Sequence, residues 1–195
     1  MQKLIVKGKK SLSGIVKISG SKNATLPILA ASILSDKKIE INNVPLVKDV
    51  ITMSQLLKYI GSNIKINSKS KKILINNKNR KFKTIAPYIF VKTMRAGIVV
   101  LGPLLSKFGK AKVSLPGGCA WGPRPVDYHI KAFKEMGAKV TLRGGYILAE
   151  GDLSASVVEF EKSSVGATGN VLMACINLNE EVIIKNAAME PEIVD

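Results

Sequence analysis

Apolar residues in this chain recur with the spacing of a helix in some stretches and with the spacing of a strand in others. The alternation of these stretches divides the chain into recurring segments. Three segments are apolar on nearly every side, and each begins at a Ser or Thr, which is typical of buried helices with a capped start. These predicted helices span residues 21–34, 93–108 and 164–178. A short strand is expected after each of them, at residues 39–43, 112–115 and 181–185.

Amphipathic helices and hairpins follow in the first two segments. The amphipathic helices are predicted at residues 47–60 and 126–136, and Gly61 and Gly137 mark their ends as glycines commonly do. Two strand pairs come next, at residues 64–67 with 73–76 and at residues 139–142 with 146–149. A Gly-Gly turn joins the second pair, which is a strong hairpin signal.

The order of elements reflects an internal repeat of roughly 72 residues. Ser21-Lys22-Asn23-Ala24-Thr25 recurs 143 positions later as Ser164-Val165-Gly166-Ala167-Thr168, and a middle copy begins at Thr93. We therefore expect an α/β (α+β) fold of three helix-sheet units around a shared axis, with the sheets outside; a looser α+β array is the alternative. A third unit would need residues to about 235, so we expect a fragment of a longer protein, or a unit completed by another chain.

The composition narrows the classes of partner. The formal charge is +16, with much of the excess between residues 64 and 83. A solvated lysine-rich surface is the favoured interpretation, attraction of anionic small molecules comes second, and nucleic-acid binding comes third because stacking aromatics are lacking. The longest apolar run, residues 96–105, is too short to span a bilayer, and the first residues lack a hydrophobic signal core. We expect a cytoplasmic protein.

A single thiol stands in the segment richest in proline and glycine. Cys119 lies within residues 115–125, which cannot form a regular helix or a central strand, and Arg124 follows five residues later. A loop cysteine near cationic groups is where a reactive thiolate is expected, while an inert surface thiol is the alternative. Cys175, on an apolar helix, has the context of a structural thiol.

Six motifs in fixed order carry a resemblance to a known family. They are Gly20-Ser21-Lys22-Asn23-Ala24, Lys92-Thr93-Met94-Arg95-Ala96, Pro116-Gly117-Gly118-Cys119, Gly122-Pro123-Arg124-Pro125-Val126-Asp127, Ser164-Val165-Gly166-Ala167-Thr168 and Glu190-Pro191-Glu192-Ile193-Val194-Asp195. Together they closely resemble the UDP-N-acetylglucosamine 1-carboxyvinyltransferases, the enolpyruvyl transferases of bacterial peptidoglycan synthesis. The likeness covers the whole chain and corresponds to roughly the N-terminal half of a family member.

The resemblance implies a fold and a reaction. Family members have two domains, each of three βαβαββ units about a pseudo-threefold axis, an inside-out α/β barrel. Residues 1–20, with strands at 3–6 and 14–18, would then pair with a missing C-terminal domain, and residues 21–195 would form a truncated N-terminal domain. In the family reaction the sugar 3-hydroxyl adds to phosphoenolpyruvate and phosphate is eliminated, without metal or organic cofactor. The substrates would be phosphoenolpyruvate and UDP-N-acetylglucosamine, with no nucleic acid or membrane partner.

The resemblance also assigns roles to residues. Cys119 would be the catalytic acid and the group that fosfomycin alkylates. Phosphoenolpyruvate would contact Lys22, Asn23 and Arg124. UDP-N-acetylglucosamine would contact Arg95, Arg124, Pro125, Val126, Asp127, Tyr128, Lys162, Ser163, Ser164 and Val165. His129, the single histidine, is interpreted as structural, and Glu190 and Glu192 as solvated carboxylates.

Three further readings remain open from the sequence. A shikimate-pathway enolpyruvyl transferase shares the fold, although the Cys119 loop and residues 162–165 argue against it. A non-catalytic module that binds nucleotide sugar is the second, and a basic nucleic-acid-binding protein is the third. Because the general-base carboxylate and a further arginine of the family lie in the C-terminal domain, we expect the isolated chain to be inactive.

Overall fold

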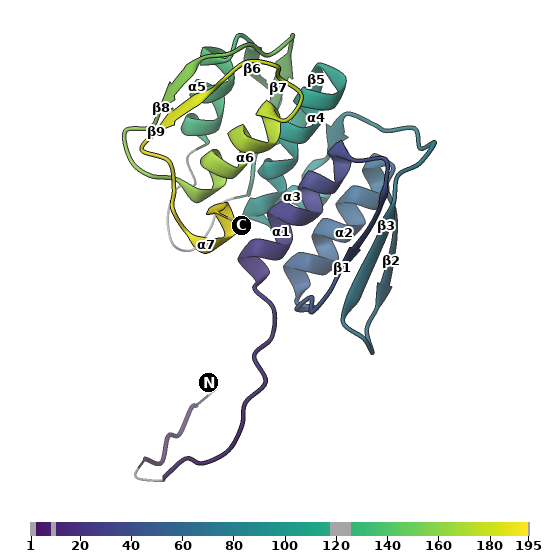
Figure 1. Cartoon of the computed structure of the whole chain (residues 1–195), viewed down its shortest axis with the longest axis vertical. Helices are drawn as coiled ribbons and strands as arrows, with labels where there is room; N and C mark the ends of the chain where they lie inside the picture. Colours follow the sequence, from purple (N-terminus) through teal and green to yellow (C-terminus); the bar gives the residue numbers. More distant parts are fainter. Residues whose placement is uncertain (1–2, 9–10, 118–125, 195) are drawn as a thin grey trace.

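The computed structural model describes residues 3–8, 11–117 and 126–194. Helices α1, α4 and α6 lie side by side in the middle of the molecule, and the three sheets lie around them (Figure 1). This arrangement confirms the prediction that the first helix of each repeat unit is buried at a shared axis. The sheets remain separate, and no closed barrel forms among the described residues.

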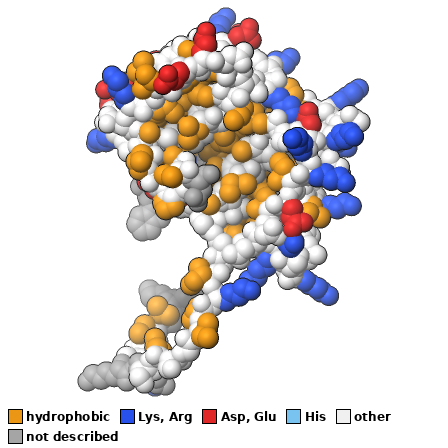
Figure 2. Space-filling view, viewed as in Figure 1, with side chains coloured by type: hydrophobic (Ala, Val, Ile, Leu, Met, Phe, Trp, Pro, Cys, Tyr) orange, Lys and Arg blue, Asp and Glu red, His pale blue; other side chains and the backbone are white. Residues whose placement is uncertain are grey.

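The first unit packs two helices against a three-stranded antiparallel sheet. Its elements are α1 (Lys22–Ala31), the 3₁₀ helix η1 (Ser32–Leu34), β1 (Lys38–Ile41), α2 (Lys48–Ile60), β2 (Asn63–Asn67) and β3 (Lys72–Asn76). The strand order is β1-β3-β2. Gly61 ends α2 at a φ of 137°, as the sequence predicts for a glycine stop. Basic side chains project from this side of the molecule (Figure 2).

The second unit is the most complete of the three. Its elements are β4 (Ile85–Ala86), α3 (Tyr88–Val91), the 3₁₀ helix η2 (Arg95–Val100), α4 (Leu101–Phe108), β5 (Lys110–Ser114), α5 (Asp127–Glu135), β6 (Lys139–Arg143) and β7 (Tyr146–Glu150). The strand order is β4-β5-β7-β6, and β4 runs parallel to β5. Gly144 and Gly145 both have positive φ angles, 58° and 76°, which the two-residue turn between β6 and β7 requires.

The third unit contains β8 (Val157–Glu159), α6 (Val165–Cys175), β9 (Ile183–Lys185) and α7 (Pro191–Val194). Strands β8 and β9 are parallel, like β4 and β5 in the second unit. The repeat extends to single backbone angles: Asn43 and Asn186, 143 positions apart, both adopt left-handed conformations with φ of 52° and 53°. The sequence analysis predicted neither β4 nor β8, because each has only two or three residues in the ladder.

The predicted helix at residues 93–108 is wrong in its first half. The chain forms a 3₁₀ helix from Arg95 and becomes α-helical only at Leu101. The residue before the first turn is Met94, which makes no side-chain capping hydrogen bond, and not the predicted cap Thr93. Pro103 gives the physical reason. Because its nitrogen carries no hydrogen, Pro103 cannot bond to the Val99 carbonyl, but it is tolerated in the first turn of a helix that starts at Leu101.

The N-terminal segment is not a strand in this structure. Residues 3–8 and 11–20 extend away from the body without regular pairing (Figure 1). Its apolar side chains are exposed, including Leu12, Ile15 and Val16. The predicted strands at residues 3–6 and 14–18 are therefore absent here, since no neighbouring strand supplies their hydrogen bonds.

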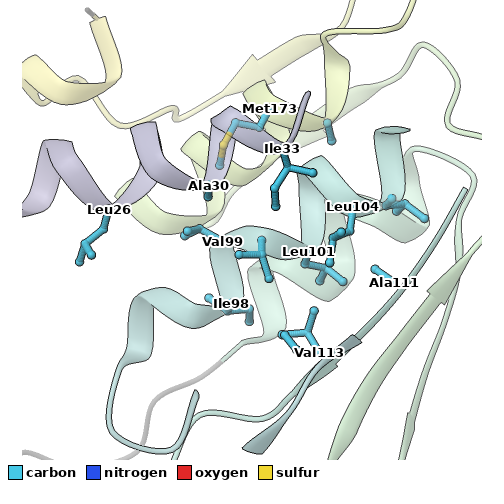
Figure 3. Close-up of a cluster of buried hydrophobic side chains, with 14 of the residues drawn as sticks. Leu26, Ala30, Ile33, Ile98, Val99, Leu101, Leu104, Ala111, Val113 and Met173 are labelled. Atoms are coloured by element: carbon cyan, nitrogen blue, oxygen red, sulfur yellow. The ribbon is translucent and has the colours of Figure 1, made fainter. Parts of the chain in front are cut away.

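The core forms where the central helices meet. Figure 3 shows Leu26 and Ala30 of α1, Leu101 and Leu104 of α4, and Met173 of α6 converging, with side chains of η2 and β5 beneath them. Gly102 allows α4 to approach α6 closely, because a Cβ atom there would lie 2.2 Å from the Asn170 carbonyl oxygen. The axis is therefore a tightly packed contact of apolar helices, and it brings the helix N-termini toward one another.

Candidate substrate site

A cavity of about 850 Å³ opens where the starts of several helices meet. Its lining comes from α1, the first turn of α2, η2, α5, the start of α6 and the segment at α7. The polar and charged residues on its wall are Lys22, Asn23, Asp49, Thr93, Arg95, His129, Ser163, Ser164, Glu190 and Glu192. Elements from all three repeat units thus contribute to one site.

The start of α1 presents a cation and an amide to the cavity. The Ser21 side-chain oxygen accepts a hydrogen bond from the Ala24 N–H at 3.2 Å, which confirms the predicted cap. Lys22 is the first helical residue, and its Nζ lies 3.1 Å from Oδ2 of Asp49. A cation at a helix N-terminus is unfavourable toward the helix dipole. The carboxylate of Asp49 offsets this repulsion, and a bound anion would do the same.

The start of α6 presents backbone N–H groups to the same cavity. Ser164 caps this helix by accepting from the Ala167 N–H at 3.4 Å. Ser163, Ser164, Val165 and Gly166 all line the cavity. The first N–H groups of a helix have no partner within the helix, and they are suited to bind phosphate oxygens.

Arg95 stands at the first position of η2, with its side chain exposed. The carboxylates of Glu190 and Glu192 line the cavity beside α7, together with Ile193. Both glutamates were expected to be solvated; Glu190 is exposed, whereas Glu192 is partly buried at the wall of the site. The described wall therefore carries cationic and anionic side chains, which suits a ligand that has both phosphate and hydroxyl groups.

His129 is a buried member of the wall that the sequence analysis set aside as structural. It lies on α5 and is 5% exposed. Its Nδ1 lies 3.0 Å from Nδ2 of Asn170 on α6. Burial, aided by the positive charge of Arg95, lowers the pKa of His129 to about 4. The imidazole is therefore neutral at physiological pH, and it is both packed in the core and in contact with the cavity.

The structure brings together part of the predicted site. Six of the predicted residues line the cavity: Lys22, Asn23, Arg95, Ser163, Ser164 and Val165. Four others are described but do not line it: Val126, Asp127, Tyr128 and Lys162. Cys119, Arg124 and Pro125 lie outside the described residues.

The four residues away from the cavity have other surroundings. Val126 is buried, Asp127 is exposed in the first turn of α5, and Lys162 is exposed. The Tyr128 ring packs on Phe160, with ring centroids 5.7 Å apart. Tyr128 therefore anchors α5 to the end of β8 in this structure.

Asp49 is a charged lining residue to which the sequence pattern assigned no role. The sequence offers little indication of a site role for Asp49, because acidic residues are common in the first turn of a helix, where they interact favourably with the helix dipole. Only the packing of α2 beside α1 brings its carboxylate to Lys22. Long-range pairs of this kind cannot be inferred from spacing along the chain.

Cys175 agrees with the structural interpretation. It is half-buried against the core, and burial raises the pKa of its thiol, which makes the reactive thiolate less accessible. The described part of the chain contains no group of three or more His, Cys, Asp or Glu residues placed to hold a metal ion. Within the same residues, every helix is too short or too polar to cross a membrane.

Comparisons with known proteins agree with the fold. The chain is 53% identical to the UDP-N-acetylglucosamine 1-carboxyvinyltransferase of Pelagibacter ubique over 197 aligned residues, which covers 100% of this chain and 46% of that protein. The enzymes of the same name from Rickettsia bellii and Chlorobaculum parvum are 53% and 48% identical. The chain thus spans about half the length of the curated relatives it matches.

Solved structures show the same fold at low sequence identity. The enolpyruvyl transferase NikO from Streptomyces tendae superposes with a TM-score of 0.80 at 16% identity, covering 94% of this chain and 43% of that one. EPSP synthase from Acinetobacter baumannii gives a TM-score of 0.73 at 15% identity, covering 96% of this chain and 43% of that one. A sequence model described as EPSP synthase (3-phosphoshikimate 1-carboxyvinyltransferase) matches residues 6–195. The chain belongs to this family of enolpyruvyl transferases.

Proposed function

We propose that this chain forms one half of a UDP-N-acetylglucosamine 1-carboxyvinyltransferase, the enzyme that transfers an enolpyruvyl group from phosphoenolpyruvate to the sugar 3-hydroxyl. The observation that carries the proposal is the cavity that gathers Lys22, Asn23 and Arg95 at the starts of α1 and η2 with the start of α6. High identity over the whole chain to relatives of that name supports the choice of substrates.

The cavity wall suits two anionic ligands. Phosphoenolpyruvate carries a phosphate and a carboxylate, and Lys22 and Arg95 offer a point charge and a planar guanidinium for such groups. The nucleotide sugar carries a diphosphate, for which residues 163–165 supply a capped helix start. Arg124 and the segment of Pro125, Val126, Asp127 and Tyr128 are proposed to bind the nucleotide, together with Lys162.

Cys119 is the proposed catalytic acid. Protonation of C3 of phosphoenolpyruvate makes C2 electrophilic, and the sugar oxygen then bonds to C2 to give a tetrahedral intermediate. Loss of a proton from C3 and departure of phosphate from C2 leave the enolpyruvyl ether. A thiol that serves as this acid is also open to alkylation, so we propose fosfomycin sensitivity at Cys119.

The remainder of the site is proposed to come from sequence that corresponds to the other half of the relatives. The chain covers 46% of the length of the Pelagibacter ubique relative. A general base for the sugar hydroxyl and a second phosphate-binding arginine would belong to that half. We therefore propose that this chain alone binds ligand with negligible turnover. In the cell, the complete enzyme would act in the cytoplasm in peptidoglycan synthesis, and thereby in cell shape and division.

Ligand binding tests the choice of substrate. UDP-N-acetylglucosamine and 3-phosphoshikimate are titrated separately into the chain by calorimetry. Binding of the nucleotide sugar, with no heat from 3-phosphoshikimate, is the expected result. The reverse preference would assign the chain to the shikimate-type branch of the family.

Phosphate release tests the catalytic step. The chain is incubated with phosphoenolpyruvate and UDP-N-acetylglucosamine, beside a Cys119→Ala variant. We expect no release from either sample, because the proposed general base and second arginine belong to the other half of the relatives. Release that requires Cys119 would show that the chain is competent by itself and would overturn the half-site proposal. If a longer protein that contains this chain binds the nucleotide sugar but releases no phosphate, a non-catalytic binding module is the better interpretation.

A further inference from the structure

The buried pair of Asn170 and His129 sets the proton position on the imidazole. Asn170 lies in the middle of α6, fully buried, and its side chain contacts three neighbours. The backbone N–H of Gly102 donates to Oδ1 of Asn170 at 2.7 Å. Nδ2 of Asn170 donates to the carbonyl oxygen of Ile98 at 3.1 Å. A backbone N–H only donates and a carbonyl only accepts, so these two contacts fix which end of the amide is oxygen and which is nitrogen.

The fixed amide leaves one role for the histidine nitrogen that faces it. Nδ2 of Asn170 lies 3.0 Å from Nδ1 of His129 and has no lone pair to offer. Nδ1 must therefore accept the hydrogen bond and carry no proton. In a neutral imidazole the proton is then on Nε2. A doubly protonated ring would set two N–H groups against each other inside the core, which agrees with the low pKa of this histidine.

The protonated edge of the ring faces the cavity. His129 is 5% exposed, yet it lines the cavity wall. Its Cε1 and Nε2 atoms lie 3.6 and 3.7 Å from the place where a Cβ would stand on Gly166, in the first turn of α6. Within the described residues, Nε2 has no hydrogen-bond partner, whereas Nδ1 has one. The ring is buried as a whole, and this Nε2–H lies beside the place where α6 begins.

We propose that His129 donates its Nε2–H to an oxygen of the diphosphate of a bound uridine nucleotide, and that Asn170 is the positioning residue that fixes this tautomer. The proposal rests on the proposed function and adds a second donor beside the N–H groups of α6. A neutral imidazole donor adds no charge, so it selects an oxygen by position, while Arg95 and Lys22 supply the attraction. The glycine at position 166 leaves the ring edge uncovered by a side chain.

Nitrogen NMR tests the tautomer directly. The chain contains one histidine, so the ring nitrogens need no assignment among residues. In the unmodified chain near pH 7, we expect a protonated Nε2 and an unprotonated Nδ1. Asn170→Asp replaces the donor with an acceptor, and it should move a proton onto Nδ1, which a merely structural role for Asn170 would not do. A proton on Nδ1 in the unmodified chain would refute the proposal.

Titration with UDP, uridine and phosphoenolpyruvate then tests the donor role. UDP should shift the Nε2 and Nε2–H resonances of His129, uridine should leave them unchanged, and phosphoenolpyruvate alone should leave them nearly unchanged. A shift with phosphoenolpyruvate alone would place the wrong anion at His129. Calorimetric binding of UDP without any shift of His129 contradicts this inference but leaves the proposed function standing. No binding of UDP contradicts both.

Two variants separate the effect of the Nε2–H donor of His129 from the effect of its Nδ1 contact with Asn170. His129→Asn places an amide where Nδ1 lies and removes the donor at Nε2, so UDP affinity should fall about tenfold, as loss of one hydrogen bond to a charged oxygen predicts. His129→Gln places an amide donor near Nε2 and gives up the contact to Asn170, so it should retain more of the affinity. Equal affinity in the unmodified chain and in a folded His129→Asn variant would overturn the donor role.

Discussion

Helices α1 and α6 are copies of one repeat element, yet they supply different chemistry to the same cavity. Both begin at a serine whose oxygen accepts from the N–H three residues later. Neither has an acidic residue in its first turn. The first helical residue is Lys22 in α1 and Val165 in α6. A shared backbone therefore presents a cation at one helix start and bare N–H groups at the other.

Helices α1 and α6 also differ in chemistry about one and a half turns after their first residues. The repeat offset of 143 matches Pro27 in α1 with Asn170 in α6. Pro27 has no N–H, so it cannot donate to the carbonyl of Asn23, another cavity residue. Asn170 instead bonds to Gly102, Ile98 and His129. Both helices pack at the centre of the molecule. Beneath the site, however, α1 lacks one backbone hydrogen bond at Pro27, and α6 carries a buried polar side chain at Asn170.

Burial differs between the copies as well. Leu29 is fully buried in α1, whereas its counterpart Leu172 is 43% exposed in α6. Thr25 donates to the Ser21 carbonyl within its own helix, while its counterpart Thr168 accepts from the N–H of Ala188 in the following segment. Identical residues at identical repeat positions thus make different contacts, because the units that surround α1 and α6 differ.

Of the variants considered, Gly102→Ala should lower stability most, because it disrupts the packing of α4 against α6. The added Cβ would stand 2.2 Å from the carbonyl oxygen of Asn170 and 2.5 Å from its Oδ1, so α4 and α6 must separate. We expect the free energy of unfolding to fall by about 3 kcal/mol, as for severe overpacking in a core. Urea denaturation measures the change. Gly8→Ala is the control, because nothing lies within 4 Å of its added Cβ. Equal stability of the two variants would contradict the close approach.

Acidification should lower the free energy of unfolding through His129, which contacts Asn170 of α6. Its folded pKa of about 4 lies below the model-peptide value of 6.5, so between these values the unfolded chain binds a proton that the folded chain does not. The free energy of unfolding should therefore be unaffected by this group above pH 6.5, and decrease as the pH falls to 4, by about 3 kcal/mol in total. Denaturation at a series of pH values measures the slope.

His129→Asn is the control for that slope. The variant has no group that titrates between pH 4.5 and 6.5 at this position, so its stability should be nearly flat in that range. A slope that persists unchanged in the variant would assign the pH dependence to other groups.

Removal of the two serine caps should affect α1 and α6 alike. Ser21→Ala and Ser164→Ala each delete the acceptor of one helix-start N–H, and each should lower the free energy of unfolding by about 1 kcal/mol. Thermal denaturation of both variants provides the comparison. A loss confined to one of them would show that the repeat preserves the sequence of the cap without its energetic role.

Asp49→Asn should have the smallest effect on stability and a distinct effect on binding. The ion pair between Lys22 and Asp49 is partly exposed, so the free energy of unfolding should change by less than about 0.5 kcal/mol. Because the variant releases Lys22 from a competing carboxylate, phosphoenolpyruvate should bind roughly threefold more tightly at low salt. Calorimetry measures the affinity, and Asp152→Asn, away from the cavity, is the matched control. Weaker binding in Asp49→Asn would show that the carboxylate supports the ligand.

Local signals explain which predictions succeeded. The serine caps, the glycine stops at Gly61 and Gly137, and the Gly144-Gly145 hairpin all depend on neighbours within a few residues. The apolar pattern over residues 93–108 predicts a longer α-helix than the one that forms, because hydrophobic spacing does not reflect the missing N–H of Pro103. The short strands β4 and β8 escaped prediction because their pairing partners, β5 and β9, lie some 25 residues further along the chain.

By itself, the sequence determined the repeat, the capped apolar helices and the residue types that suit anionic ligands, because periodicity and capping are local properties. Only the tertiary structure decided that Lys22 meets Asp49 and that Asn170 sets the tautomer of His129. Those contacts join residues 27 and 41 positions apart. They exist because the central helices pack closely around one axis, and the closeness of that packing depends on the absence of a side chain at Gly102.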